Sequence, residues 1–117
     1  MKEKDAQEVG FIILTEYYAN MFDGPITNLF DILIEEDVFD YSYFPKEDLW
    51  RFAHQLDEYL NKKVFTTELF QNSLKMWIAC AKKKIRLFEF DTNQVNISNN
   101  TGIPIKRIME FIQYIEN

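Results

Sequence analysis

Only three glycines and three prolines interrupt this chain of 117 residues, and that scarcity constrains the fold more than any other feature. An all-β sandwich or barrel needs turn-forming residues every ~8–12 positions, and long irregular loops need them too. Hydrophobic residues make up 47% of the chain and aromatic residues 16%, enough apolar surface to offset the entropy lost on folding. The sequence therefore predicts an all-α fold, a compact bundle of about five to six helices in a single domain spanning residues 1–117.

Apolar residues at helical spacing locate the expected helices. They predict helices over residues 5–22 and 25–37, a third that begins at Pro45, and a fourth that begins at Thr66 or Thr67 and ends before Asp91. Proline suits the first position of a helix because the N–H that it lacks would be unpaired there. One segment is ambiguous. Residues 85–90 alternate in polarity, so a short hairpin near residues 85–98 is the alternative, with residues 95–97 as its returning strand.

Charge divides the chain into two parts. Residues 1–60 hold four bases against fourteen acids, a net charge of −10, and residues 61–117 hold nine bases against five acids, a net charge of +4. We therefore distinguish an acidic helical part, residues 1–63, from a basic part, residues 64–117. Opposed halves of this kind favour contact with nucleic acid or with a charged partner, and salt bridges between the halves are the alternative.

Residues 94–113 have the spacing of two short helices joined by a tight turn. Ile97 is the inward residue of the first helix, and the small Ser98 allows a close helix crossing. Gly102 stands where the turn needs a positive φ, Ile103 follows as a core residue, and Pro104 begins the second helix. The buried stripe of that second helix comprises Ile108, Phe111 and Ile112.

This segment resembles the helix-turn-helix DNA-binding superfamily, in the Thr-Gly-Ile-Pro form common among bacterial regulators, over residues 94–113 only. The resemblance implies transcription regulation through double-stranded DNA, with the second helix in the major groove. Arg107 would then pair with guanine and Gln113 with adenine, while lysines of the preceding helix would contact phosphates. The candidate DNA-binding residues are Lys82, Lys83, Lys84, Arg86, Lys106, Arg107, Glu110 and Gln113.

The composition of the second helix leaves other readings open. Ile105 and Met109 fall on the side where a DNA reader presents polar groups, so that the helix is apolar nearly all round. Such a helix is more often buried or pressed against a partner. The helix therefore faces a DNA groove, a partner or the protein's own core. In the DNA-binding interpretation, the acidic helical part, residues 1–63, would form a homodimer or bind a partner.

Enzymatic chemistry is not expected. With one histidine, one cysteine and three glycines, the usual nucleophile–base sets and phosphate-binding loops are missing, and no spacing resembles a calcium loop. No metal and no cofactor are therefore expected. Cys80 lies in an apolar run and is expected to be a buried packing residue. The lack of disulfides, of a signal peptide and of an apolar run of ~18 residues favours a cytoplasmic protein without membrane contact.

A second class of function fits the acidic half. A small acidic inhibitor, of the phage anti-defence or immunity type, would bind a basic protein, namely the basic surface of a nucleic-acid-handling enzyme, and substitute for phosphate charge. Aromatic side chains surrounded by charge are common anchors at such surfaces. The candidate partner-binding residues are Glu35, Glu36, Asp37, Phe39, Asp40, Tyr41 and Tyr43.

Overall fold

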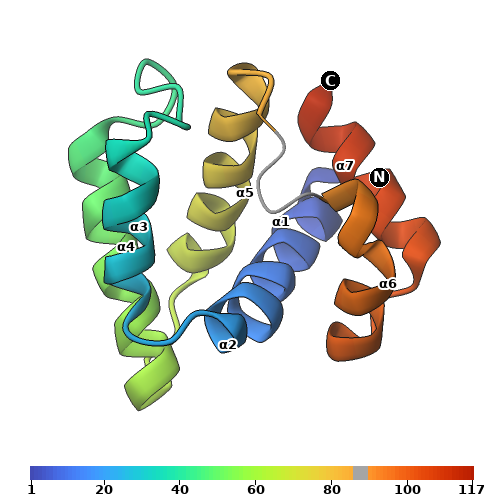
Figure 1. Ribbon diagram of the computed structural model, residues 1–117, viewed down its shortest axis with the longest axis horizontal. Coiled ribbons are helices and arrows are strands. Elements are labelled where there is room, and N and C mark those ends of the chain that lie inside the picture. The colour runs from blue at the N-terminus through green and yellow to red at the C-terminus, as the bar shows by residue number, and fades with distance from the viewer. Residues whose placement is uncertain (86–89) are drawn as a thin grey trace.

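The chain folds into a bundle of helices (Figure 1). A computed structural model describes the backbone of residues 1–85 and 90–117 and the side chains of residues 1–85 and 93–117. Over these residues the fold is all-α, as predicted, and contains no strand. The elements are α1 (Glu3–Ile12), the π-helical segment η1 (Ile13–Tyr18), α2 (Ala19–Met21), α3 (Ile26–Glu35), α4 (Lys46–Lys62), α5 (Thr67–Lys82), α6 (Phe90–Thr101) and α7 (Ile105–Glu116).

The first three elements run on from one another, close to the single helix predicted over residues 5–22. The prediction missed the π-helical segment, in which each turn takes up more residues than in an α-helix. Within it the consecutive residues Tyr17 and Tyr18 are both buried, and their rings meet edge to face with centroids 4.8 Å apart.

Helices α3 and α4 form an antiparallel pair at one side of the molecule. Asp57 of α4 fixes their register, because its carboxylate accepts hydrogen bonds from the backbone N–H groups of Ile26 (2.7 Å) and Thr27 (3.1 Å). These groups at the start of α3 have no partner within the helix, and a carboxylate there also complements the helix dipole. Pro25 and Pro45 each directly precede the first helical residue, one position before the first helical position at which the sequence predicts them.

The other end of α3 carries acids, which the helix dipole disfavours. In the structure, Lys83 at the C-terminal end of α5 supplies a cation there. The Lys83 ammonium lies 2.9 Å from the Asp37 carboxylate and donates a hydrogen bond of 2.6 Å to the Asp37 carbonyl oxygen. The loop after α3 is also held to α5, because the Asp40 N–H donates to the carbonyl oxygen of Ala79 at 3.0 Å.

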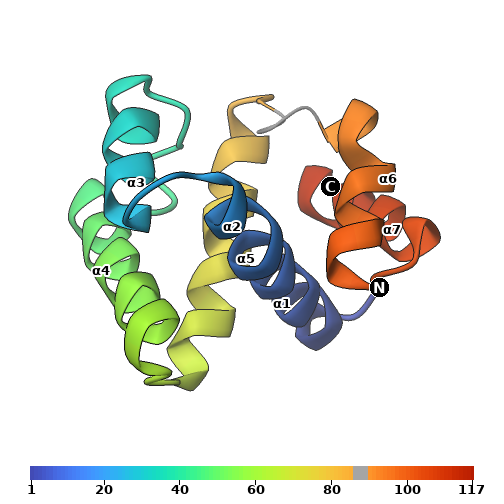
Figure 2. The same cartoon turned by 60° about the horizontal axis from the view of Figure 1, so that its bottom comes forward.

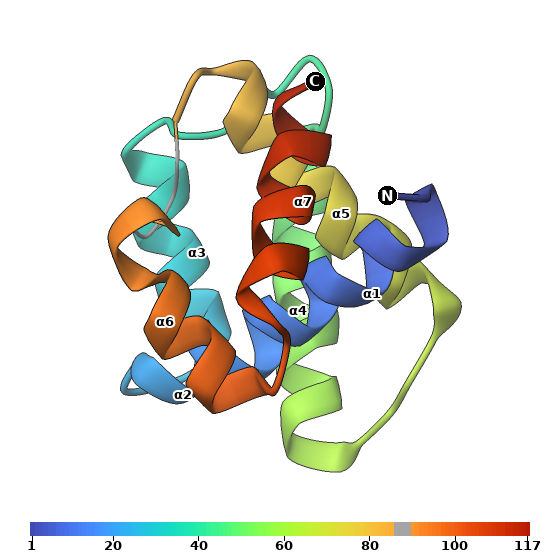
Figure 3. The ribbon, with the colours of Figure 1, turned by 90° about the vertical axis from the view of Figure 1, so that its right-hand side faces the viewer.

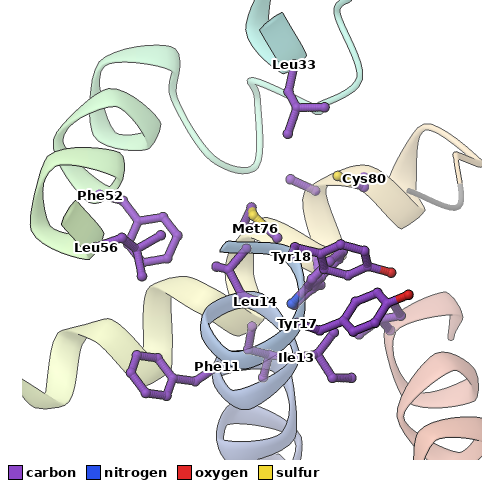
Figure 4. Close-up of a cluster of buried hydrophobic side chains, with 14 of the residues drawn as sticks. Phe11, Ile13, Leu14, Tyr17, Tyr18, Leu33, Phe52, Leu56, Met76 and Cys80 are labelled. Atoms are coloured by element: carbon purple, nitrogen blue, oxygen red, sulfur yellow. The ribbon is translucent and has the colours of Figure 1, made fainter. Parts of the chain in front are cut away.

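The helices form three groups side by side (Figures 1 and 2). The α3–α4 pair lies on one side, α6 and α7 lie on the other, and α1 and α5 cross between them. Buried side chains from all three groups join one hydrophobic core, part of which is shown in Figure 4 around Leu14, Met76 and Tyr18.

The hairpin alternative is wrong in its returning strand. Residues 95–97 lie inside helix α6, and Ile97 is fully buried on its inner face. Residues 86–89, which would form most of the other strand, lie outside the described residues. Residues 95–97 join α6, which packs against η1 and α7 and buries Ile97.

Candidate functional site

Helices α6 and α7 are joined by a turn of residues 102–104, at the position expected from the sequence. Gly102 has φ +77°, in the left-handed region that favours glycine, and its N–H donates to the Ser98 carbonyl oxygen at 2.9 Å. The Thr101 hydroxyl accepts from the N–H of Ile103 at 3.2 Å. Pro104 caps α7, where its carbonyl accepts from Arg107 and Ile108. The turn therefore fixes how α7 leaves α6.

The inner face of this unit is apolar and packs on the rest of the molecule. Helix α7 lies against α1 and α5, and α6 lies against η1 (Figure 3). The residues predicted to be buried are all buried: Ile97, Ile103, Ile108, Phe111 and Ile112. The pair of helices is therefore fixed to the protein through one face and presents its other face outward.

The outer face of α7 mixes apolar and polar side chains. Ile105 is 39% exposed and Met109, one helical turn later, is 48% exposed, while Lys106 and Gln113 are exposed beside them. On α6, Val95 is 57% exposed. Of the three surroundings considered for this helix, the protein's own core is excluded for Ile105 and Met109.

Two other candidate residues of α7 are turned toward the protein. Arg107 is half-buried and its guanidinium lies 3.5 Å from the carboxylate of Asp5 on α1. Glu110 is half-buried as well. This salt bridge joins the acidic part of the chain to the basic part, which is the alternative that the charge distribution left open. It also reduces the positive charge that α7 offers to a ligand.

The candidate lysines at the end of α5 have different environments. Lys83 is engaged by Asp37, whereas Lys82 and Lys84 are exposed. Lys82 and Lys84 line a hollow of about 660 Å³ together with Tyr114 and Glu116 near the end of α7. Since α7 is ~18 Å long, these lysines lie at the opposite end of the helix from Lys106. Arg86 lies outside the described residues.

The rings of Tyr43 and Phe44, which precede α4, and lysines of α5 form a cluster that was not predicted as one site, although Tyr43 and Lys82 were candidates for different sites. The Tyr43 ring lies under two ammonium groups, with Lys75 at 5.8 Å and Lys82 at 5.0 Å from the ring centroid. Lys75 also lies 5.1 Å from the centroid of Phe44. The sequence signal was the spacing of Lys75, Ile78 and Lys82, which places three residues on one face of a helix.

The acidic and aromatic candidate residues at the end of α3 and in the loop after it do not form one exposed surface. Phe39 is only 1% exposed and stacks near Phe30 in the core, with ring centroids 6.2 Å apart, so its proposed role as a surface anchor is wrong. The Tyr41 hydroxyl donates to the Ile34 carbonyl at 2.9 Å. The Ser42 hydroxyl and N–H donate to the Asp40 carboxylate and hold its pKa below the usual range. Glu35 and Glu36 remain exposed.

Other chemistry has little support among the described residues. They contain no group of three or more histidine, cysteine or acidic residues placed to hold a metal ion, and none of their helices has the length and apolar character needed to span a bilayer. Cys80 is buried, as expected, and burial raises the pKa of its thiol well above the usual range. The exposed His54 lies beside Trp50 on α4, with ring centroids 5.5 Å apart.

The chain was compared with models of protein families, with curated proteins and with solved structures, and none of them matches. What the site does is therefore inferred from its own geometry.

Proposed function

We propose that this protein is a small non-enzymatic regulator that binds double-stranded DNA through α7. One observation carries the proposal: α7 follows a fixed three-residue turn, buries one face, and presents Lys106 and Met109 outward from its first two turns, with Gln113 exposed one turn further along. A recognition helix contacts base edges with residues in this part of the helix. The resemblance of residues 94–113 to helix-turn-helix proteins supports the same assignment.

The apolar residues on the outer face have a role in this proposal. The thymine methyl group lies in the major groove and is contacted by apolar side chains. Ile105 and Met109 lie one turn apart and flank Lys106, so we expect them to favour sites rich in A·T pairs. Gln113 suits adenine and Lys106 suits guanine or a phosphate.

The charge distribution predicts weak binding outside the preferred site. Arg107 is engaged by Asp5 and Lys83 by Asp37, which leaves Lys106, Lys82 and Lys84 as the exposed candidate cations among the described residues. Non-specific affinity for DNA comes mainly from phosphate contacts and rises with their number. An acidic protein with few such contacts depends on base contacts for its affinity.

Selection from a pool of random duplexes, followed by fluorescence polarisation at several salt concentrations, tests the proposal. We expect enrichment of an A·T-rich site, steep weakening with salt, and loss of affinity in Lys106→Ala and Gln113→Ala. Lys62→Ala is the matched control, because Lys62 is an exposed lysine at the end of α4. The proposal fails if no site is enriched and no duplex binds at about 100 µM protein in low salt, where even non-specific binders are detected.

A second candidate function, inhibition of a basic nucleic-acid-handling protein, is favoured by the surface of the α3–α4 pair. Glu35, Glu36, Glu47 and Glu58 are exposed, and none of them has a salt bridge within the described part of the chain. Exposed acids of one sign accelerate association with a basic surface in a salt-dependent way. Charge reversal at Glu35 and Glu36 would abolish this capture and leave DNA binding unchanged, which separates the two functions.

A further inference from the structure

The outer face of α4 carries an exposed tryptophan. Trp50 is 36% exposed, whereas Trp77 is buried in the core. The ring of His54, one turn further along α4, lies against Trp50, with ring centroids 5.5 Å apart. Glu47, one turn before this pair, and Glu58, one turn after it, are both exposed. We call the side of α4 that these residues share at helical spacing the Trp50 face: Glu47, Trp50, His54 and Glu58.

We propose that the Trp50 face binds an arginine-rich segment of a basic partner protein, with an arginine guanidinium stacked on the ring of Trp50. Tryptophan is the side chain whose ring attracts a cation most strongly, and the planar guanidinium stacks on such a ring. Both residue types are enriched among those that dominate the energy of protein interfaces. The inference rests on the second candidate function, because it locates the contact of that basic partner on the α3–α4 pair.

The surroundings of the Trp50 face are strongly acidic. Residues 23–58, which include α3, the loop after it and most of α4, hold ten acids against two bases, a net charge of −8. Both bases have partners within this segment: Arg51 lies 3.1 Å from the Asp48 carboxylate, and Lys46 lies 5.5 Å from the centroid of the Tyr41 ring. A lysine of α5 neutralises one of the acids. The excess of carboxylates complements a cationic segment and accelerates its approach.

Trp50 differs from the other exposed or half-buried rings in having no cation of its own. Four rings of this chain lie beneath a lysine ammonium at 5.0–5.8 Å from the ring centroid, namely those of Tyr41, Tyr43, Phe44 and Tyr59. No lysine or arginine of the described residues lies over Trp50 in this way. The contact with His54 also limits the freedom of the Trp50 ring, which reduces the entropy lost when a partner binds.

The charge of this region argues against other occupants. A second copy of the chain would bring a surface of the same sign, and nucleic acid or anionic lipid would be repelled in the same way. The α3–α4 pair and α7 lie on opposite sides of the molecule (Figures 1 and 2). A partner on the Trp50 face would therefore leave the proposed DNA-binding helix uncovered, and the two activities can be measured separately.

Titration of the full chain with short labelled peptides tests the proposal. The probe is an unstructured glycine–serine peptide with spaced arginines, and the comparison peptides carry lysines or glutamines at the same positions. We expect the arginine peptide to bind about threefold more tightly than the lysine peptide and about tenfold more tightly than the glutamine peptide. The affinity for both cationic peptides should fall as the salt concentration rises.

The indole N–H signals of the two tryptophans provide a readout with an internal control. The signal of Trp50 should shift when the arginine peptide binds, whereas that of Trp77, which donates to the Gly10 carbonyl inside the core, should not. Trp50→Leu should remove the preference for arginine over lysine. Glu47→Gln should weaken the binding of both cationic peptides about twofold. The matched control is Glu16→Gln, which removes an exposed acid of η1 outside this face and should leave the affinity nearly unchanged.

The outcomes separate this inference from the function on which it rests. Equal binding of the arginine and lysine peptides overturns the contact with Trp50 but leaves capture of a basic protein by charge standing. If neither cationic peptide binds, both fail. Equally tight binding of the glutamine peptide, or a Trp50 signal that shifts with protein concentration alone, also overturns the proposal, since the face would then bind an apolar segment or a second copy. The wild-type signals decide the matter if Trp50→Leu fails to fold.

Discussion

The Trp77 indole donates a hydrogen bond of 3.0 Å to the carbonyl oxygen of Gly10, across the crossing of α1 and α5. The contact is close because Gly10 has no side chain. A Cβ at Gly10 would lie 3.0 Å from Trp77 Cδ1 and 3.2 Å from the ring of Phe111, which comes from α7. Three helices thus meet at one residue, and the position of α7 depends on the absence of a single methyl group in α1.

Replacing Gly10 by alanine should therefore destabilise the protein although it improves helix propensity. The propensity gain is about 1 kcal/mol, and crowding of a packed core costs about 1–3 kcal/mol, so we expect a net loss of up to about 2 kcal/mol. Urea denaturation measures it. Gly102→Ala is the comparison, because nothing lies within 4 Å of its Cβ and its cost comes only from φ. Equal or higher stability of Gly10→Ala would show that the crossing is looser than described.

Trp77→Phe should cost about 1–2 kcal/mol, because it leaves the Gly10 carbonyl without the indole donor and opens a small void in the core. A double-mutant cycle with Gly10→Ala should show coupling, since the smaller phenyl ring makes room for the new methyl group. Additive effects of the two changes would contradict the contact. The tryptophan fluorescence of the variant should come from the partly exposed Trp50 alone.

Asp57→Ala should destabilise the α3–α4 pair by about 1–2 kcal/mol, because two backbone N–H groups of α3 lose their acceptor. Hydrogen exchange should increase at Ile26 and Thr27 before it increases elsewhere. Glu58→Ala is the matched control, as Glu58 is the neighbouring acid and is exposed. A similar loss in both variants would assign the effect to overall charge.

Asp5→Asn should raise affinity for DNA about two- to fivefold if α7 is the DNA-binding helix. The substitution releases Arg107 from its salt bridge and makes its guanidinium available to a phosphate or a guanine. Fluorescence polarisation measures the change, and the affinity should also depend more steeply on salt. Glu8→Gln removes an exposed acid of the same helix without touching Arg107, and an equal rise there would point to net charge instead.

Cys80 should be unreactive toward a thiol reagent at pH 8 in the native protein and reactive after unfolding. Burial raises the pKa of its thiol, so the folded protein holds the proton at a pH where the unfolded chain, with a pKa of ~8.5, loses it. The resulting contribution to stability is complete below pH ~8.5 and is lost as the pH rises toward the folded pKa. Cys80→Ala should therefore lose less stability than the wild type between pH 8 and 10. Rapid labelling of Cys80 in the native protein would show that its thiol is not buried.

Local patterns were sufficient for much of the fold. The helical stripes, the prolines before α3 and α4 and the Gly102 turn each depend on residues close together in the chain, and the structure confirms them. The partners of Arg107 and Lys83 could not be predicted, because Asp5 and Asp37 reach them only through the packing of α1 on α7 and of the α3 loop on α5. For the same reason Phe39 was placed on the surface: its acidic neighbours suggested exposure, and only the tertiary structure shows the core beneath it.

The π-helical segment η1 accommodates one residue more than a regular α-helix would in the same stretch. Loss of one residue between Ile13 and Tyr18 would allow a regular α-helix while the residues on both sides keep their orientation, so Gly10 would still face Trp77 and Phe111. Loss of one residue after Gly10 within α1 would instead rotate Gly10 by about 100° relative to the rest of the helix and turn it away from both rings. The effect of a deletion in the first helix therefore depends on whether it falls inside η1 or before it.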